Sequence, residues 1–391
     1  MRILVIWGES LAKPGGGTVH CLGLVRGWKS LGHDVAVVAP SYSDMPQPSL
    51  GGEFGFLSLG RRSMLSFLLF QALAVLLLPV WMVRNRSQVV YVRTCFLSGL
   101  MAVVSRLFGT ALIVEIDGAT DKEILLRGES RWVARLTRMI DSINNSLVHG
   151  LVCVTEPLRD LNIARGARPS RCIAIPNGSP TDIMQPLDTA ACRTEMQFGV
   201  DDVIIGFVGT FAPWQGLDFL LDAVALLKSR KVAGFRFVLV GGGQMEESIR
   251  HRVQQDNLQP LVTLLPPMDN SRIPVFLSAC DASILPRHDK NILPYGSPLK
   301  FFEAIAVGLP VLVPRGSGLE PILADLGLPG VFDASSPSHL ANAIEHLLPQ
   351  LPSLRHGRER IHARVADRYS WKNVARRIVT FAEGLGEGPS R

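Results

Sequence analysis

Apolar and polar residues alternate along the chain in blocks that predict two rounds of strand–helix–strand units. The predicted strands of the first round are the continuous apolar runs at residues 2–7, 35–38, 89–93, 111–116, 151–155 and 172–175. The second round has runs at residues 203–208, 235–240, 262–265, 282–285 and 311–313. Helix-spaced segments separate most of these runs, whereas residues 41–60, rich in serine, proline and glycine, are predicted to be a loop. The pattern predicts an α/β protein with two doubly wound, parallel-sheet domains.

The most informative segment reads YGSPLKFFEAIAVGLPVLV, from Tyr295 to Val313. It predicts a helix with Ser297 as its N-cap, followed by a buried strand. Lys300 and Glu303 are three residues apart, so their side chains share one face of this helix. A lysine beside a helix N-terminus favours a phosphate, and a carboxylate one turn later can accept hydrogen bonds from a ribose diol. An ordinary surface Lys–Glu pair has the same spacing, so spacing alone leaves both interpretations open.

Other candidate residues follow predicted strands, where ligands bind in open α/β sheets. Gly16 and Gly17 follow the first strand and allow close approach of the backbone to a phosphate or sugar, although a merely flexible turn is the favoured interpretation of this motif taken alone. Their pattern is not GxGxxG, and no acidic residue ends the second strand, which disfavours a dinucleotide site. Glu115 and Asp117 lie at the end of the strand at 111–116, where a loop of solvated acids would have the same pattern as a ligand site. Arg287 follows the strand at 282–285.

Two helical segments raise the question of a membrane. Residues 64–83 are long and apolar enough to span one, and arginines flank them within residues 61–86. A buried crossover helix is favoured, because a span would divide the first sheet; a helix with one face in a lipid leaflet comes second, and a true span comes last. The helix at 130–147 is predicted to bury Trp132 and the apolar residues in register with it. Its stripe of Arg131, Arg135 and Arg138 is either a solvated face or a contact for anionic lipid headgroups.

Composition narrows the classes of partner. The chain of 391 residues has a net charge of +6, which suits an acidic partner, but no dense basic run with interleaved aromatic residues indicates nucleic acid. Its six cysteines are scattered, which predicts reduced thiols and no metal site. The N-terminal apolar run is too short for a signal peptide. We therefore expect a cytoplasmic protein, at the inner face of the membrane if the lipid contact exists.

Several segments together resemble the family 4 retaining glycosyltransferases of the GT-B fold, over nearly the whole chain. The segment at 297–312 is the most specific match, accompanied by PNG at 176–178 and a glycine-bounded loop at 208–216. A GGxxxH-like start at 16–20 ends in His20, and Tyr369 with Trp371 resembles the start of the family's terminal helix. The resemblance implies two Rossmann-like domains facing across a cleft. Residues 1–180 with the helix at 368–385 form the acceptor-side domain, and residues 181–367 form the donor-side domain.

The resemblance also implies roles for the matching residues. Lys300 and the helix N-terminus would hold a nucleotide diphosphate, Glu303 would bind the ribose hydroxyls, and Glu115 or Asp117 would face the donor sugar or the acceptor. The acceptor candidates are His20 and Arg93. The remaining donor-binding candidates are Gly16, Gly17, Gly209, Thr210, Gln215, Pro267, Met268, Arg287, Ser297 and Leu299. No metal or other cofactor is expected, since the nucleotide-sugar is a co-substrate.

The chain departs from the family pattern at three positions. Thr210 and Gln215 stand where the family often has a basic pair, and Tyr295 stands where it often has an acidic residue. We predict transfer of a sugar, with retention, from a UDP- or GDP-linked donor to a hydroxyl of a glycan or lipid-linked glycan, as in synthesis of surface polysaccharide or lipopolysaccharide. The alternatives are a sugar-nucleotide epimerase of the same architecture and a non-catalytic scaffold, which the three departures motivate.

Overall fold

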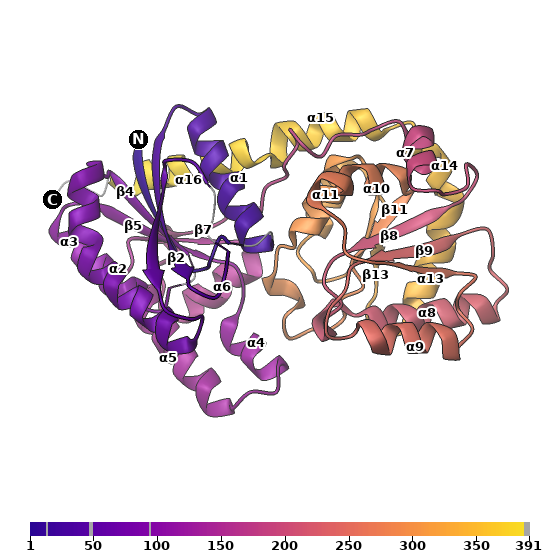
Figure 1. Ribbon diagram of the computed structural model, residues 1–391, viewed down its shortest axis with the longest axis horizontal. Helices are drawn as coiled ribbons and strands as arrows, with labels where there is room; N and C mark the ends of the chain where they lie inside the picture. Colours follow the sequence, from indigo (N-terminus) through magenta and orange to yellow (C-terminus); the bar gives the residue numbers. More distant parts are fainter. Residues whose placement is uncertain (13–14, 47–49, 94, 387–391) are drawn as a thin grey trace. The chain divides into compact units, whose positions relative to one another are not determined.

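The computed structural model describes residues 1–386 apart from 13–14, 47–49 and 94, and it divides the chain into two compact units. Unit 1 comprises Met1–Gly178, Tyr295–Ser297 and the segment from Trp371 onward, and unit 2 comprises Ser179–Pro294 and Pro298–Ser370. Each unit holds one parallel sheet with helices packed around it (Figure 1). The predicted α/β class with two doubly wound sheets is therefore confirmed.

The sheet of unit 1 has seven strands, all parallel to their neighbours, and its order reverses between β1 and β4. In spatial order the strands are β3 (Phe54–Leu59), β2 (Asp34–Tyr42), β1 (Arg2–Trp7), β4 (Val89–Arg93), β5 (Ala111–Ile116), β6 (Gly150–Cys153) and β7 (Cys172–Ala174). The prediction of a loop over residues 41–60 was wrong, because β3 lies within it. This edge strand is only partly buried and contains Gly55 and Ser58, so its apolar pattern is weak.

Helices cover both faces of this sheet. They are α1 (Gly16–Ser30), α2 (Met64–Asn85), α3 (Ser98–Leu107), α4 (Thr120–Leu126), α5 (Arg131–Leu147), α6 (Glu156–Ala164) and α16 (Trp371–Gly386). Right-handed crossovers from β3 to β4, β4 to β5 and β5 to β6 place α2, α3 and α5 on one face, while α1 covers the other. In agreement, α3 contacts both α2 and α5, and α16 packs against α1 (Figure 1).

The C-terminal helix returns to unit 1 and packs tightly on α1. A Cβ at Gly23 would lie 2.4 Å from Cε2 of Trp371, and one at Gly27 would lie 2.6 Å from the Trp371 carbonyl oxygen. Glycine at both positions therefore permits this close helix pair. The helix predicted to run from 368 to 385 is interrupted, because Ser370 adopts an extended conformation (φ −67°, ψ 153°) after α15 (Arg358–Tyr369).

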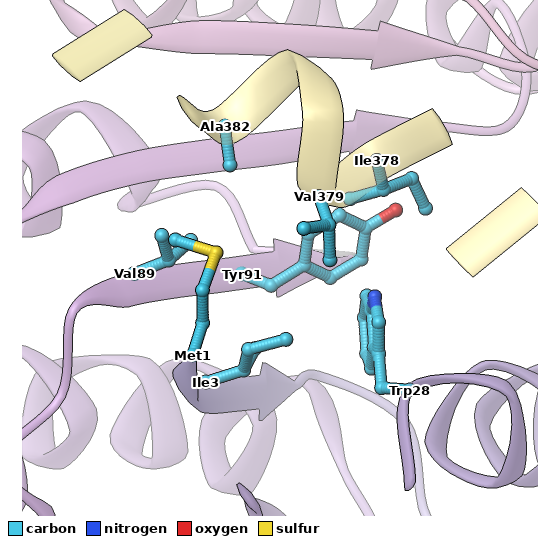
Figure 2. A pocket seen from close by; sticks show the side chains of 8 residues that line it. All are labelled: Met1, Ile3, Trp28, Val89, Tyr91, Ile378, Val379 and Ala382. Carbon is cyan, nitrogen blue, oxygen red and sulfur yellow. The ribbon is translucent and has the colours of Figure 1, made fainter. Parts of the chain in front are cut away.

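Figure 2 shows a small apolar pocket where α16 covers β1 and β4. Trp28 of α1 and Tyr91 of β4 line it, together with side chains of α16. The other lining residues are Met1, Ile3, Val89, Ile378, Val379 and Ala382. The pocket lies at the amino ends of β1 and β4, opposite to the strand ends at which ligands of such sheets bind. We interpret it as packing between α16 and the sheet.

Unit 2 has a six-stranded parallel sheet whose order reverses between β8 and β11. In spatial order its strands are β10 (Val262–Leu265), β9 (Arg236–Val240), β8 (Ile204–Val208), β11 (Ala282–Ile284), β12 (Val311–Pro314) and β13 (Val331–Phe332). The remaining helices are α7 (Thr189–Glu195), α8 (Leu217–Ser229), α9 (Glu246–Gln255), α10 (Ile273–Ala279), α11 (Leu299–Ala306), α12 (Glu320–Leu326), α13 (Pro337–Leu347) and α14 (Leu351–Arg355).

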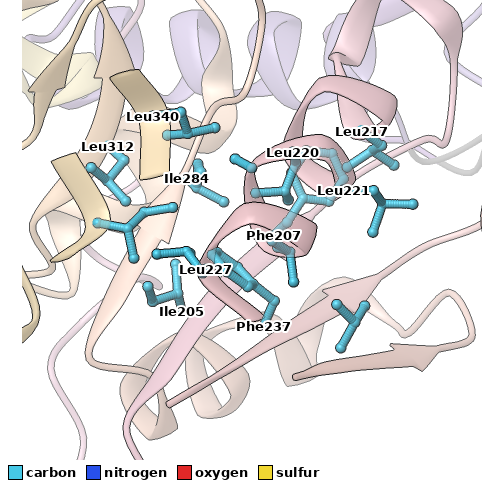
Figure 3. Packing of buried hydrophobic residues seen from close by; sticks show 14 of the residues in the cluster. Ile205, Phe207, Leu217, Leu220, Leu221, Leu227, Phe237, Ile284, Leu312 and Leu340 are labelled. Atoms are coloured by element: carbon cyan, nitrogen blue, oxygen red, sulfur yellow. The ribbon is translucent and has the colours of Figure 1, made fainter. Parts of the chain in front are cut away.

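Buried apolar side chains fill both faces of the unit 2 sheet. On one face, leucines of α8 pack against Phe207 and Phe237 of the central strands and against Leu340 of α13 (Figure 3). On the other face, Phe301 and Phe302 of α11 are fully buried together with residues of α10 and α12. Burying this apolar area fixes α11 against the sheet, which positions the candidate site described next.

Candidate functional site

The carboxyl ends of β8 and β11 flank the point where the strand order of unit 2 reverses. Gly209 and Thr210 follow β8, Arg287 comes three residues after β11, and α11 begins on the way from β11 to β12. Because all strands are parallel, these segments meet at one edge of the sheet, the usual ligand-binding edge of such folds. Unit 2 therefore gathers most of the predicted donor-binding residues at one edge.

Two glycine-containing loops pack directly against each other at this edge. The Gly209 amide donates to the Val240 carbonyl (3.0 Å), and Phe211 N–H donates to the Gly242 carbonyl (2.9 Å). A Cβ on Gly241 (φ 151°) would lie 1.9 Å from the Gly209 carbonyl oxygen. Only glycine fits there, because both the backbone conformation and the space exclude a side chain. The Gly241–Gly243 loop thus supports the Gly209 loop, a role that was not predicted.

Lys300 reaches from the first turn of α11 across Gly209. A Cβ at Gly209 would lie only 2.3 Å from Lys300 Nζ. The ammonium group donates a hydrogen bond to Gln215 Oε1 (3.0 Å) and lies 4.3 Å from the centroid of the Phe207 ring. The side chain is therefore held in place by one amide and one aromatic face, and no carboxylate of the described residues lies within ion-pair distance of it.

The charges around Lys300 are incompletely compensated. The pKa of Lys300 is lowered to about 7, mainly by burial and then by the neighbouring Arg287, while Glu303 partly opposes this shift. Burial also raises the pKa of Glu303, although Lys300 opposes that shift. A bound dianionic diphosphate would favour the protonated lysine. The charges of the site therefore favour binding of an anion at the α11 N-terminus and of hydrogen-bond donors at Glu303.

Pro267 and Met268 follow β10 at the same edge. Pro267 is exposed, and a Cβ on Gly242 would lie 3.4 Å from its ring. Met268 is half-buried and packs against the core under α11. The loop therefore offers an apolar surface for the face of a nucleobase and backbone groups for hydrogen bonds with its edge.

In unit 1 the corresponding edge carries a row of side chains across three strands. The strand register pairs Trp7 of β1 with Arg93 of β4, and Arg93 with Glu115 of β5. The Arg93 guanidinium lies 4.6 Å from the Trp7 ring centroid, forms an ion pair with Asp117 and lies 3.5 Å from Glu9 Oε2. Burial would lower the pKa of Arg93, but these carboxylates keep it above its usual value. Arg93 is therefore a buried, permanently charged group.

Glu115 is the centre of a buried hydrogen-bond network. Its two carboxylate oxygens bind His20 Nε2 (2.8 Å) and the Tyr91 hydroxyl (2.7 Å), and only 5% of the residue is exposed. Burial alone would raise the pKa of Glu115, but His20, Arg93 and Tyr91 hold it below its usual value. The His20 ring also lies 4.8 Å from the ring of Trp371, at the start of α16. This arrangement suits Glu115 to positioning His20 better than to direct contact with a sugar.

The N-terminus of α1 lies next to this network. Gly16 is the first residue of the helix, and a Cβ on Gly17 would lie 1.9 Å from Glu9 Oε2 and 3.7 Å from a nitrogen of Arg93. Glycine at position 17 thus lets the carboxylate of Glu9 approach the helix N-terminus, where negative charge is favoured. Glu9 was not among the predicted site residues, because a single acid in a loop carries no sequence signal.

Among the described residues, no group of three or more His, Cys, Asp or Glu side chains is arranged to hold a metal ion. The positive charge at the unit 2 edge comes from Lys300, Arg287 and the α11 N-terminus.

Comparisons with known proteins identify the family. Residues 191–361 match the family described as glycosyl transferases group 1, and residues 15–178 match the glycosyl transferase 4-like domain. The two matches together cover most of the chain. The protein belongs to the group 1 glycosyltransferases. A D-inositol 3-phosphate glycosyltransferase of Acidothermus cellulolyticus is 30% identical over 231 residues, which span 57% of this chain and 50% of that protein. The match with a Mycobacterium bovis protein of the same name spans 59% of that protein. The chain therefore spans about half the length of the curated relatives that it matches.

Solved structures confirm the GT-B architecture. A sucrose-phosphate synthase of Thermosynechococcus elongatus superposes with a TM-score of 0.77 at 17% identity, covering 98% of both chains. HepE of Anabaena in complex with UDP superposes with a TM-score of 0.73 at 16% identity, covering 98% of this chain and 100% of that one. At these identities the likeness concerns the fold.

One sequence-based detail of this family site was wrong. Ser297 does not cap α11: the N-cap is Pro298, and Ser297 Oγ instead accepts a hydrogen bond from the Asn177 amide (3.1 Å). Asn177 belongs to the PNG motif, so both residues serve to join two segments of unit 1. Gln215, which replaces a basic residue of the family pattern, holds Lys300, and Tyr295 accepts a hydrogen bond from Lys122 (3.3 Å). A single-residue cap signal could not reveal these long-range contacts.

Proposed function

We propose that the protein transfers a sugar, with retention of anomeric configuration, from a UDP- or GDP-linked donor to a hydroxyl group. The observation that carries the proposal is Lys300, held over Gly209 at the N-terminus of α11, with Glu303 one turn away. A nucleoside diphosphate presents a diphosphate and a ribose diol, which match these two groups. The family match and the UDP bound to HepE support the donor class.

During the chemical step, negative charge develops on the leaving diphosphate. Lys300, Arg287 and the N-terminus of α11 would stabilise that charge as it develops, which is the largest catalytic contribution available to this site. Glu303 would hold the ribose. Within the part of the chain that the structure describes, no side chain of the donor site is arranged as a nucleophile with an adjacent base. Direct attack by the acceptor hydroxyl, deprotonated by the donor phosphate, therefore fits the site.

We propose a glycan or lipid-linked glycan as the acceptor, bound by unit 1 near Asp117, Arg93 and His20. The name of the Acidothermus relative suggests a second acceptor class, a phosphorylated polyol. Arg93, at the carboxyl end of β4, is already paired with Asp117 and Glu9, so its charge gives no preference for this second class.

Calorimetric titration of UDP, GDP and ADP into the full-length protein tests the donor site. We expect micromolar binding of one nucleotide, weakened by roughly 1.5–3 kcal/mol in Glu303→Ala. Glu247→Ala is the matched control, because Glu247 is an exposed carboxylate of unit 2 on α9. If the folded protein binds none of these nucleotides, the result would support a non-catalytic scaffold.

Product analysis with nucleotide-sugars separates transfer from epimerisation. We expect release of the nucleoside diphosphate only when an acceptor glycan is added. Conversion of the nucleotide-sugar into its epimer without an acceptor would replace the transferase proposal with the epimerase.

A further inference from the structure

Helix α5 has its apolar face turned away from the protein. Its buried residues are Ala134, Thr137 and Asn145, which are small or polar. The larger apolar residues at helical spacing lie on the opposite side of the helix and are exposed, with Trp132 at 70% and Met139 at 54%. The prediction that this helix buries Trp132 and the residues in register with it was therefore wrong. A strongly amphipathic helix in this orientation needs an external apolar partner.

The exposed apolar side chains of α5 belong to a larger surface. The helices α2, α3 and α5 lie on one face of the unit 1 sheet, and α3 contacts both of the others (Figure 1). We call this surface the outer face. Its exposed apolar residues are Met64, Leu65, Leu68, Leu69, Leu76, Val80 and Val83 of α2, Leu100, Val103, Leu107 and Phe108 at α3, Leu125 and Leu126 of α4, and Trp132, Val133, Leu136, Met139 and Ile143 of α5. Exposed apolar side chains in this number, on helices that contact one another, mark an interaction site.

The outer helix α2 is long and apolar enough to cross a membrane, but its position in the fold indicates a peripheral contact. It connects β3 to β4, and Phe70, Ala74, Leu78 and Met82 along its length are buried against the sheet. Gln71 on the same side accepts a hydrogen bond from the Leu97 amide (3.0 Å). One side of α2 thus belongs to the core of unit 1, as the favoured crossover prediction requires, and the other side is available to a partner.

The charges around the outer face are mostly positive; the acids beside it include Glu123 of α4, which pairs with Arg127, and the exposed Glu129. Helices α2 and α3 contain no acidic residue, and the single acid of α5, Asp141, lies 3.9 Å from Arg165. The exposed basic residues on or beside these helices are Arg61, Arg62, Arg84, Arg86, Arg106, Arg127, Arg131, Arg135 and Arg138. Among the described residues, no carboxylate lies within ion-pair distance of the three arginines of α5.

From these observations we propose that the outer face docks on an anionic lipid membrane surface, with the apolar side chains in the acyl boundary and the arginines at the headgroups. Apolar residues with a basic rim and an exposed tryptophan are the chemistry of an interfacial helix. A second copy of the chain fits less well, because a two-fold interface would place each arginine rim against its own copy. The proposal is independent of the donor nucleotide, and it places the protein at the cytoplasmic leaflet, where anionic lipids attract basic residues.

Vesicle sedimentation of the full-length protein, without nucleotide, tests the proposal. We expect binding to phosphatidylcholine vesicles that contain about 40% phosphatidylglycerol, and at least roughly tenfold weaker binding to phosphatidylcholine alone. Binding at about 0.5 M NaCl should also fall, because salt screens the arginines. Absence of sedimentation with anionic vesicles at low salt would overturn the proposal.

Two sets of variants separate the apolar and the charged contributions. Trp132→Ser with Met139→Ser should weaken vesicle binding at least about tenfold, whereas Val200→Ser with Ile183→Ser, at exposed apolar positions of unit 2, should leave it unchanged. Arg131→Gln, Arg135→Gln and Arg138→Gln together should weaken it by up to about a hundredfold. The control with the same change in net charge replaces Arg250, Arg272 and Arg360 of unit 2 by glutamine.

Nucleotide titration and light scattering complete the test. All four variants should keep wild-type nucleotide affinity, so loss of vesicle binding is distinguished from failure of the proposed donor site. Equal loss of vesicle binding in the variants of unit 1 and their controls would overturn the assignment to the outer face. A wild-type dimer that Trp132→Ser dissociates, without any lipid binding, would show that a second copy covers the face.

Discussion

Both units carry charged groups at the carboxyl edge of a parallel sheet, but the two units differ in how far neighbouring groups compensate these charges. In unit 1 the buried ions are paired: Arg93 is surrounded by carboxylates, and both oxygens of Glu115 are hydrogen-bonded. In unit 2, Lys300 and Glu303 are half-buried without a close ion pair, and burial shifts the pKa of each toward its neutral form. A completed network stabilises a fold, whereas uncompensated charges gain most when a ligand arrives. The comparison predicts that unit 2 supplies catalysis and that the Glu115 network supplies structure.

The largest expected effect is on catalysis and comes from removing the uncompensated cation. Lys300→Met keeps most of the side-chain volume but removes its charge, so turnover with the best nucleotide-sugar should fall by a factor on the order of 10²–10³. Donor affinity should change less, since the charge on the leaving group grows in the transition state. Steady-state kinetics measure both parameters. An unchanged turnover with weaker binding would assign Lys300 to ground-state binding only.

The next effect concerns stability, for which we expect the larger loss from a substitution in unit 1 and the smaller loss from one in unit 2. Glu115→Ala leaves buried His20 and the Tyr91 hydroxyl without their carboxylate, so the free energy of unfolding should fall by about 3–5 kcal/mol. Lys300→Met should lower it by less than about 1 kcal/mol, because a poorly paired buried charge costs desolvation energy. Urea unfolding of both variants makes the comparison. Equal losses would show that Lys300 is as structural as Glu115.

A smaller effect is expected from pH. The pKa of Lys300 is lowered to about 7, and a diphosphate binds the protonated form, so affinity should be highest below that pH and decrease as pH rises. UDP-glucose is a suitable probe because its diphosphate keeps its charge over this range. Its affinity should fall by about tenfold between about pH 6 and about pH 8. In Lys300→Met the affinity should not depend on pH in this range; the same decrease in the variant would exclude Lys300 as the titrating group.

The smallest effect tests the residue that departs from the family pattern. Gln215→Ala removes the hydrogen bond to Lys300 Nζ without changing the charge, so turnover should fall only severalfold, on the order of 1 kcal/mol. Gln215→Lys would restore a family-like cation but place it against Lys300, and it should lower the pKa of Lys300 further. Kinetics of both variants decide whether Gln215 only positions Lys300. A loss as large as that of Lys300→Met would make Gln215 a direct ligand of the donor.

The sequence alone was sufficient for the parallel sheets, for the strand-end positions of Arg287, Glu115 and Asp117, and for the shared face of Lys300 and Glu303. These features depend on local periodicity, which two to four neighbouring residues define. The weak edge strand β3 and the position of the α11 N-cap were missed, because a half-buried edge and a serine used for a distant hydrogen bond have no distinctive local pattern.

Only the tertiary structure decided how distant residues meet. It placed His20 against Glu115, Gln215 against Lys300, and the Gly241 loop against Gly209, since each contact joins segments from different strands or helices. It also reversed the interpretation of α5, whose pattern correctly predicted an amphipathic helix but not which side is buried. Periodicity determines that a helix has two faces, whereas the surrounding packing decides which of them remains exposed.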